Sequence, residues 1–183
     1  CYLKLLHEYR STPEGLSAAI KISGPLSPDD AFIVAQTYLD HERYKDAIHR
    51  FKRFIDHYPR HIRASSAQYL LGQALSRNGQ FDLAISAFNK AHKLGVEKAL
   101  YRIGDTQIKQ NNELIAIKNF EKFAEQYPNH DLADDALWQA AKAAERNSQF
   151  TDSKRLYTRI VDDYPQSNHR EDAEWGLGFS YFC

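Results

Sequence analysis

The sequence predicts an all-α protein, built as a solenoid of stacked antiparallel helix pairs, and two observations support this fold class. Small and aromatic residues recur together at intervals of 32 to 37 residues, an interval typical of helical repeat architectures. Within each interval, apolar residues recur at spacings of three and four, which places them on one face of an α-helix. No stretch shows the apolar–polar alternation of a β-strand.

A small residue anchors the second half of each repeat, and a second small residue lies twelve positions before it. Successive anchors lie 37, 32 and 37 residues apart, and an aromatic follows each anchor by four positions. Small side chains let two helices approach to about 8–10 Å, and we expect the aromatics to fill the space toward the next unit. The second-half anchors are Ala47, Ala84, Ala116 and Ser153, their aromatics are Phe51, Phe88, Phe120 and Tyr157, and the first-half anchors are Ala35, Gly72, Gly104, Ala141 and Gly178.

The helices of each unit can be placed in order along the chain. The first helix is expected to begin at Ser27, a good N-cap residue, with Pro28 at the first helical position. The second is expected from Tyr44 until Pro59, which disfavours an α conformation in the residue before it. Asn78-Gly79 is a turn signal between the helices of the next unit. The units are expected at residues 27–63, 64–96, 97–132 and 133–169, with 170–183 as the first helix of a fifth unit.

The two ends of the chain lie outside complete repeats. Residues 1–26 are expected to form an N-terminal helical cap or a degenerate repeat, with a second short helix starting near Thr12. At the other end, a helix over 170–183 would expose the apolar side chains of Leu177 and Tyr181. We therefore expect that the natural protein continues beyond this sequence or that another chain packs there.

Composition excludes several classes of protein. The 183 residues include 24 Lys and Arg and 24 Asp and Glu, and this neutral balance argues against a dedicated nucleic-acid binder. No apolar run approaches the roughly 20 residues of a membrane-spanning helix. The two cysteines, Cys1 and Cys183, form neither a disulfide framework nor a zinc motif.

Sequence motifs of catalysis are absent. We find no nucleophile elbow, P-loop or dinucleotide-binding fingerprint. His57 and His61 have the spacing of helical metal ligands, but Pro59 lies between them, so both are interpreted as solvated surface residues. The pair Asp134-Asp135 is better explained by a helix N-terminus than by acid–base catalysis. The sequence therefore predicts no enzyme, no cofactor and no metal.

The repeated motifs resemble those of tetratricopeptide repeats (TPR). The resemblance consists of a Leu-Gly pair in the first helix, as in Leu71-Gly72, then Ala followed four positions later by Phe, then Pro. It spans about residues 28–183 and implies a right-handed superhelical solenoid whose first helices line a concave surface. The sequence departs from the pattern at Val96, which replaces Pro, at Ser153, which replaces Ala, and at the 32-residue step.

The segments between repeats resemble those of bacterial envelope proteins with TPR units. Tyr-Pro pairs end the second helices, and polar residues with an Asp-Ala pair follow, as in Tyr127-Pro128 and Asp135-Ala136. Such proteins include the β-barrel assembly lipoprotein, the periplasmic cell-division coordinator and the helical domains of lytic transglycosylases. The resemblance implies a periplasmic or outer-membrane-associated location. Cys1 is a candidate lipidated residue, although no polar tether follows it.

An aromatic stripe along the first helices is the candidate binding site. An aromatic residue precedes each first-half anchor by three positions. The residue four positions after each of these aromatics is mostly polar. If the first helices line a groove, this stripe would hold a peptide by stacking and hydrogen bonding. The alternative is that these rings are core. The predicted partner-binding residues are Phe32, Gln36, Tyr69, Gln73, Tyr101, Asp105, Trp138, Lys142 and Trp175.

These observations predict a non-catalytic protein–protein interaction scaffold in bacterial cell-envelope assembly. It would bind a peptide or partner protein through the aromatic groove or an open solenoid end, and a glycan strand is an alternative ligand. The residues Phe32, Gln36 and Gln73 do not match the basic TPR pocket for acidic C-terminal peptides. Two alternatives remain: a helical, non-catalytic domain of a larger peptidoglycan-acting enzyme, and an oligomerisation module that self-associates through its C-terminal end.

Overall fold

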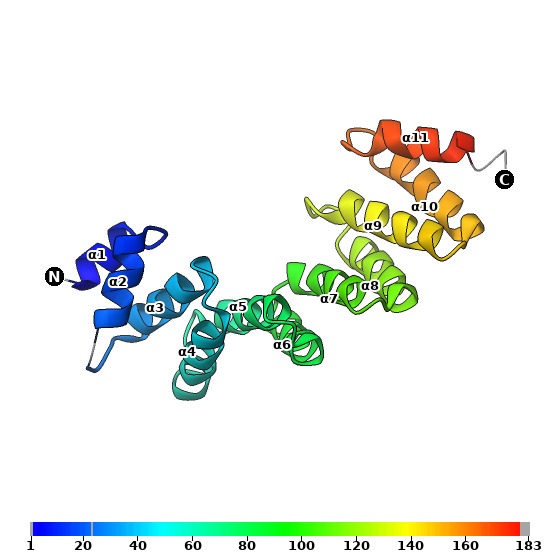
Figure 1. Cartoon of the computed structure of the whole chain (residues 1–183). Helices are drawn as coiled ribbons and strands as arrows, with labels where there is room; N and C mark the ends of the chain where they lie inside the picture. Colours follow the sequence, from blue (N-terminus) through cyan, green and yellow to red (C-terminus); the bar gives the residue numbers. More distant parts are fainter. Residues whose placement is uncertain (1, 23, 180–183) are drawn as a thin grey trace. The chain divides into compact units, whose positions relative to one another are not determined.

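The fold is all-α, which confirms the predicted fold class, and the helices form consecutive antiparallel pairs (Figure 1). The computed structural model describes residues 2–22 and 24–179, without the side chain of Phe179. No strand occurs in this part of the chain. The chain divides into two compact units, Cys1–Val96 (unit 1) and Glu97–Cys183 (unit 2).

The division between the units falls at the 32-residue step, between the second and third repeats. The helices of unit 1 are α1 (Tyr2–Glu8), α2 (Pro13–Lys21), α3 (Pro28–Asp40), α4 (Tyr44–His57), α5 (Ala64–Arg77) and α6 (Phe81–Lys93). The helices of unit 2 are α7 (Lys98–Lys109), α8 (Glu113–Gln126), α9 (Ala133–Arg146), α10 (Phe150–Asp163) and α11 (Arg170–Phe179).

One ring contact recurs in all four helix pairs, α3–α4, α5–α6, α7–α8 and α9–α10. An aromatic of the first helix meets an aromatic of the second, with ring centroids 5.2 to 6.0 Å apart. This contact lies inside the pair, whereas we expected the second-helix aromatics to face the next unit. The four contacts are Phe32–Phe51, Tyr69–Phe88, Tyr101–Phe120 and Trp138–Tyr157.

The glycine anchors lie directly against aromatic rings of the second helix of their pair. A Cβ atom added at Gly72 would lie 2.6 Å from the ring of Phe88, and one at Gly104 would lie 2.7 Å from the ring of Phe120. A glycine therefore makes room for each ring. The second-half anchors are buried as well, which confirms the predicted spine of small residues; they are Ala47, Ala84, Ala116 and Ser153.

The turn between the two helices of a pair has one geometry in all four repeats. Its central residue adopts a left-handed conformation, and the next amide donates to the carbonyl five residues back, as from Gln80 N–H to Leu75 O at 2.9 Å. This bond satisfies a carbonyl at the helix C-terminus. Glycine takes the left-handed position in one repeat, as the Asn78-Gly79 signal predicted. The four residues are Glu42 (φ 58°), Gly79 (φ 76°), Asn111 (φ 59°) and Ser148 (φ 57°).

Glycine is favoured at two equivalent turn positions, so adding it at one and removing it at the other should change stability in opposite directions. Ser148→Gly should raise the free energy of unfolding by about 0.5–1 kcal/mol, because a side chain disfavours this conformation. Gly79→Ala should lower it by a similar amount, although a Cβ there meets no atom within 4 Å. Chemical denaturation measures both. A loss of stability in Ser148→Gly would contradict the repeat alignment of the turns.

The Tyr-Pro segments form a second recurring turn, between one pair and the next. The backbone N–H of the third residue after Tyr donates a hydrogen bond to the Tyr carbonyl. The side chain of that same residue accepts a hydrogen bond from the backbone N–H two positions later. His61, His130 and Ser167 take this role. His61 also packs against Phe54, with ring centroids 5.7 Å apart. The interpretation of His61 as a merely solvated residue is therefore wrong.

The N-terminal helices α1 and α2 pack against α3. Leu6 is fully buried, and His7 Nε2 lies 2.8 Å from Asp30 Oδ1. Hydrogen bonds from His7 and then Ser27 hold the pKa of the Asp30 carboxyl below its usual value. Ser27 accepts from the Asp30 amide at 3.1 Å, which confirms it as the N-cap.

The last helix has no second helix after it within the described residues. A Cβ at Gly178, the anchor position, meets nothing within 4 Å, whereas one at Gly176 would lie 2.7 Å from the ring of Tyr157. Gly176 is therefore the glycine that lets α11 approach α10. Cys1, Tyr181 and Cys183 lie outside the described residues.

Candidate functional site

A pocket in unit 2 brings three of the predicted site residues together. It lies between α9, α10 and α11 and has a volume of about 270 Å³. Trp138 and Lys142 come from α9, and Trp175 comes from α11. The remaining lining residues are Glu145, Tyr157, Asp172 and Gly176.

Packed partners fix the orientation of the Trp138 ring. The His169 ring stacks on it, with centroids 4.9 Å apart and planes 7° from parallel. Tyr157 lies against it at 5.6 Å, and Lys142 Nζ lies 5.7 Å from the centroid. Because its position is set by these neighbours, Trp138 needs little ordering when a ligand arrives.

A hydrogen-bonded carboxylate positions His169 in turn. Asp135 Oδ1 lies 3.2 Å from His169 Nε2, and Asp135 Oδ2 accepts a hydrogen bond from the Tyr101 hydroxyl. Burial, and then this bond to a carboxylate, raises the pKa of the Tyr101 hydroxyl. The network joins α7, α9 and the loop before α11, so the third and fourth helix pairs together support the pocket.

Polar groups line the other side of the pocket. Glu145 accepts from the Tyr157 hydroxyl at 2.9 Å and pairs with Lys142 at 2.5 Å. Burial, followed by the bond to Glu145, raises the pKa of Tyr157. Asp172 has no hydrogen bond or ion pair with another described residue. Its carboxylate can therefore accept a hydrogen bond from a ligand.

Trp175 differs from every other ring of the predicted stripe in its exposure. It is 73% exposed, whereas Trp138 is half-buried and Phe32, Tyr69 and Tyr101 are buried. A large exposed apolar ring beside a concave, partly polar surface is typical of an interaction site. The stripe becomes accessible only at α9 and α11 among the described residues.

The other predicted site residues are engaged within their own units. In unit 1, Gln36 accepts a hydrogen bond from Arg10 at 3.1 Å, and Gln73 donates to the Tyr69 hydroxyl at 3.1 Å. In unit 2, Asp105 accepts from Arg102 at 2.7 Å. Their part in partner binding, and that of Phe32, Tyr69 and Tyr101, stays a prediction.

Sequence reasoning missed several residues of the pocket. Glu145 and Asp172 carry a usable signal, because each lies three positions from a predicted site residue on the same helix and so shares its face. His169 carries none, since the equivalent residues of the earlier repeats are Arg63 and Leu132.

The half-buried carboxyl of Asp105 predicts a pH effect on stability. Partial burial raises its pKa above the ordinary value of an aspartate, and the hydrogen bond from Arg102 only partly opposes this. As the pH falls from 7 toward 4, the folded state binds this proton before the unfolded state does, so the wild type should gain stability relative to Asp105→Asn. Urea unfolding of both proteins across this range measures the difference. A difference that stays constant or moves the other way would contradict the effect.

Family models match two consecutive parts of the chain. Residues 35–95 match a model described as "Tetratricopeptide repeat" (TPR_16), and residues 95–182 match one described as "Outer membrane lipoprotein" (YfiO). The first match begins within α3 and extends just past the end of α6. The chain therefore contains tetratricopeptide repeats. The second match contains the pocket of unit 2.

Known structures share the fold of this TPR protein at low sequence identity. A structure of MamA aligns with a TM-score of 0.73 and 19% identity, covering 95% of this chain and 93% of that one. The nearly identical TPR-like repeats of a kinesin light chain from Podosopora anserina align with a TM-score of 0.68 and 11% identity, covering 91% and 95%. At these identities the likeness shows the fold alone.

A curated relative of the TPR protein is a human enzyme. Peptidyl-prolyl cis-trans isomerase FKBP4 of Homo sapiens is 24% identical over an alignment that covers 77% of this chain and 33% of that protein. This chain therefore spans about a third of the length of that relative.

Among the described residues, no helix of the TPR protein has the length and apolar character needed to cross a membrane.

Proposed function

We propose that this TPR protein is a non-catalytic scaffold that binds a segment of a partner protein in the pocket of unit 2. The observation that carries the proposal is the exposed Trp175 ring facing the same pocket as the preorganised Trp138. Tryptophans in such settings supply much of the affinity of protein interfaces. TPR proteins bind protein partners, and all but one of the residues that line the pocket lie on the first helices α9 and α11.

The chemistry of the pocket indicates what it would hold. Two indole rings provide apolar stacking area, and Asp172 provides a free acceptor at the edge. An apolar or aromatic side chain of a peptide would fill the space between the rings, and a backbone N–H or a basic side chain would reach Asp172. At about 270 Å³, the pocket takes one or two side chains rather than a folded domain.

A bacterial envelope setting is part of the proposal. The segment that matches the outer membrane lipoprotein model, residues 95–182, includes every residue that lines the pocket. This match supports a periplasmic or outer-membrane-associated scaffold. A role in envelope assembly follows if the partner is itself an envelope protein.

The only tryptophans of the chain, Trp138 and Trp175, both line this pocket, so their emission reports its occupancy without a label. A displayed library of random twelve-residue peptides would be panned on the protein, and enriched peptides would be titrated against its tryptophan fluorescence. We expect a saturable change that Trp175→Ala removes. Enriched peptides that leave the emission unchanged would contradict the proposed site.

Two other readouts separate the alternative ligands. Fragments of peptidoglycan glycan strands, titrated in the same way, should leave the emission unchanged; a saturable change with them, and none with peptides, would favour the glycan alternative. Light scattering over a range of protein concentrations tests self-association. A mass that rises with concentration in the wild type but not in Trp175→Ala would place a second copy in the pocket instead.

A further inference from the structure

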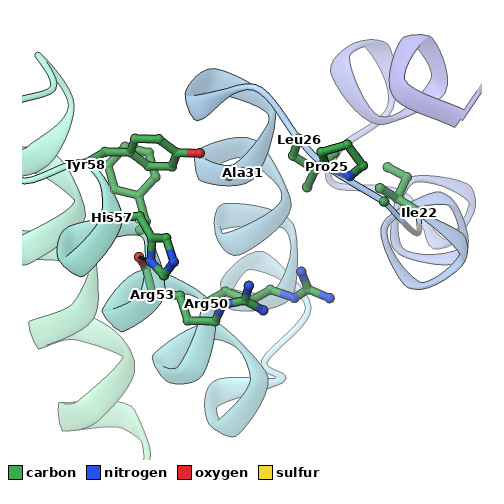
Figure 2. Close-up of a pocket in the computed structure, with 10 residues that line it drawn as sticks. Ile22, Pro25, Leu26, Ala31, Arg50, Arg53, His57 and Tyr58 are labelled. Atoms are coloured by element: carbon green, nitrogen blue, oxygen red, sulfur yellow. Dashed lines mark hydrogen bonds between the residues drawn. The ribbon is translucent and has the colours of Figure 1, made fainter.

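A second pocket lies in unit 1, between α4 and the linker that joins α2 to α3. Its volume is about 420 Å³. Figure 2 shows Arg50, Arg53 and His57 of α4 on one side and Ile22, Pro25 and Leu26 of the linker on the other. Its remaining lining residues are Gly24, Ala31, Phe54 and Tyr58. None of these belongs to the predicted aromatic stripe.

The basic side of this pocket has no carboxylate partner. Arg50, Arg53 and His57 follow one another at spacings of three and four, so they share a face of α4. No ion pair joins any of them to a described acidic residue. His57 Nδ1 lies 2.9 Å from the Arg53 carbonyl and donates its proton to that oxygen.

The acidic residues of α3 and of the first turn of α4 are paired elsewhere. Asp29 pairs with Arg63 at 2.6 Å, Asp30 contacts His7, and Asp46 pairs with Arg43 at 2.9 Å. Asp56 is exposed on α4 but does not line the pocket. The arginines of the pocket therefore have no paired carboxylate among the described residues.

The charge of the surrounding region has the same sign. Residues 43–93 contain ten Lys and Arg and three Asp and Glu, and unit 1 as a whole contains 13 against 9. Unit 2 contains 11 against 15, which is why the chain as a whole is neutral. A local positive potential attracts an anionic ligand and speeds its association.

The apolar side of the pocket narrows the class of ligand. The side chains of Ile22 and Leu26 offer nothing to a free phosphate or a nucleic-acid backbone, but they suit a bulky aliphatic or aromatic group. The ring of Tyr58, which lies beside His57 on the other side of the pocket (Figure 2), adds apolar surface. The planar guanidinium groups of Arg50 and Arg53 match the geometry of a carboxylate. A ligand that uses both sides therefore joins a carboxylate to an adjacent apolar group.

We propose that this pocket binds an acidic segment of a partner protein, in which Asp or Glu lies next to a bulky apolar residue such as Leu or Phe. The carboxylate is held by Arg53 and Arg50, with His57 at its edge, and the apolar side chain packs against Leu26 and Ile22. The pocket lies within unit 1, so this site is independent of the one proposed in unit 2.

The test uses the full chain carrying Trp175→Ala, which disables the unit 2 pocket, as bait for a displayed library of random twelve-residue peptides. Enriched peptides should carry Asp or Glu beside Leu, Phe or Trp. Fluorescein-labelled copies would be titrated by anisotropy, along with copies in which each acidic residue is replaced by its amide. We expect the amide copies to bind at least about tenfold more weakly, as the loss of charge-assisted bonds requires.

Matched variants assign the effect to the pocket. Arg50→Gln/Arg53→Gln should weaken binding at least about tenfold, whereas Lys45→Gln/Lys52→Gln removes the same charge from exposed parts of α4 outside the pocket and should change it by less than about twofold. Arg50 also packs on the Tyr38 ring at 4.6 Å. The single variant Arg53→Gln, at an exposed position, therefore repeats the test without disturbing that contact.

Three results would overturn the proposal. In the first, the panning yields no peptide whose binding depends on Arg50 and Arg53. In the second, acidic and amide peptides bind equally. In the third, vesicles of phosphatidylglycerol bind with the same dependence on these arginines while peptides do not, which would identify a membrane surface instead. Because the tryptophans lie in unit 2, a change in their emission bears only on the other site.

Discussion

Gly104→Ala is expected to destabilise unit 2 by about 1–2 kcal/mol. The added Cβ would lie 2.7 Å from the buried ring of Phe120, and forcing extra atoms into a packed core costs about 1–3 kcal/mol. The better helix propensity of Ala returns up to about 1 kcal/mol of this. Ala141 occupies the equivalent position in α9, so the repeat can accommodate a Cβ atom there. The loss should therefore stay moderate.

The matched control is the same substitution at Gly178, the repeat-equivalent position in α11. There the Cβ meets nothing within 4 Å among the described residues, so Gly178→Ala should be neutral or stabilising. Urea unfolding measures both variants. Phe120→Leu should lessen the loss caused by Gly104→Ala, and a double-mutant cycle quantifies this coupling. Equal effects at the two glycines, or a cycle without coupling, would show that ring contact does not restrict this position.

Trp175→Ala is expected to weaken partner binding by about 2 kcal/mol, or roughly thirtyfold, with almost no loss of stability. The ring is 73% exposed, so its removal leaves no cavity and should change the free energy of unfolding by less than about 0.5 kcal/mol. Titration calorimetry with a peptide selected on the wild type measures the affinity, and a thermal melt followed by circular dichroism measures the stability.

Two further variants serve as a control and a comparison for Trp175→Ala. Phe150→Ala removes another exposed aromatic of unit 2, 52% exposed and outside the pocket, and should leave the affinity unchanged. Trp138→Ala should lower both affinity and stability, because His169 and Tyr157 pack on that ring. An affinity that survives Trp175→Ala would remove the basis of the proposed function, as would an equal loss in Phe150→Ala.

The sequence predicts the helix pairs well because repetition supplies the same information several times. Each small anchor on its own is an ordinary Ala or Gly, but its recurrence at Ala47, Ala84 and Ala116 identifies a helix crossing. The Tyr-Pro turns and the Ser27 cap are predictable for a more local reason, since one or two residues determine the backbone conformation there.

The neighbour that a helix face contacts, and the exposure of the side chains on that face, are harder to predict than the helical period. A helical period shows which residues share a face, but not which neighbour that face meets, so the inward contact of Phe88 with Tyr69 was not expected. For the same reason the stripe could not be divided into buried rings, such as Phe32, and accessible ones, such as Trp175. His169 was missed because it lies in a turn whose equivalents carry other residues, and no pattern identifies a residue that occurs once.

The bonds between neighbouring repeats have a consequence for how the chain folds. Tyr101 joins Asp135, Arg63 joins Asp29 and Arg155 joins Glu121, each across only 34 positions. Low contact order of this kind leads to fast folding, because no long loop has to close before contacts form. Nucleation can begin at any repeat and spread to its neighbours, as in a one-dimensional Ising chain.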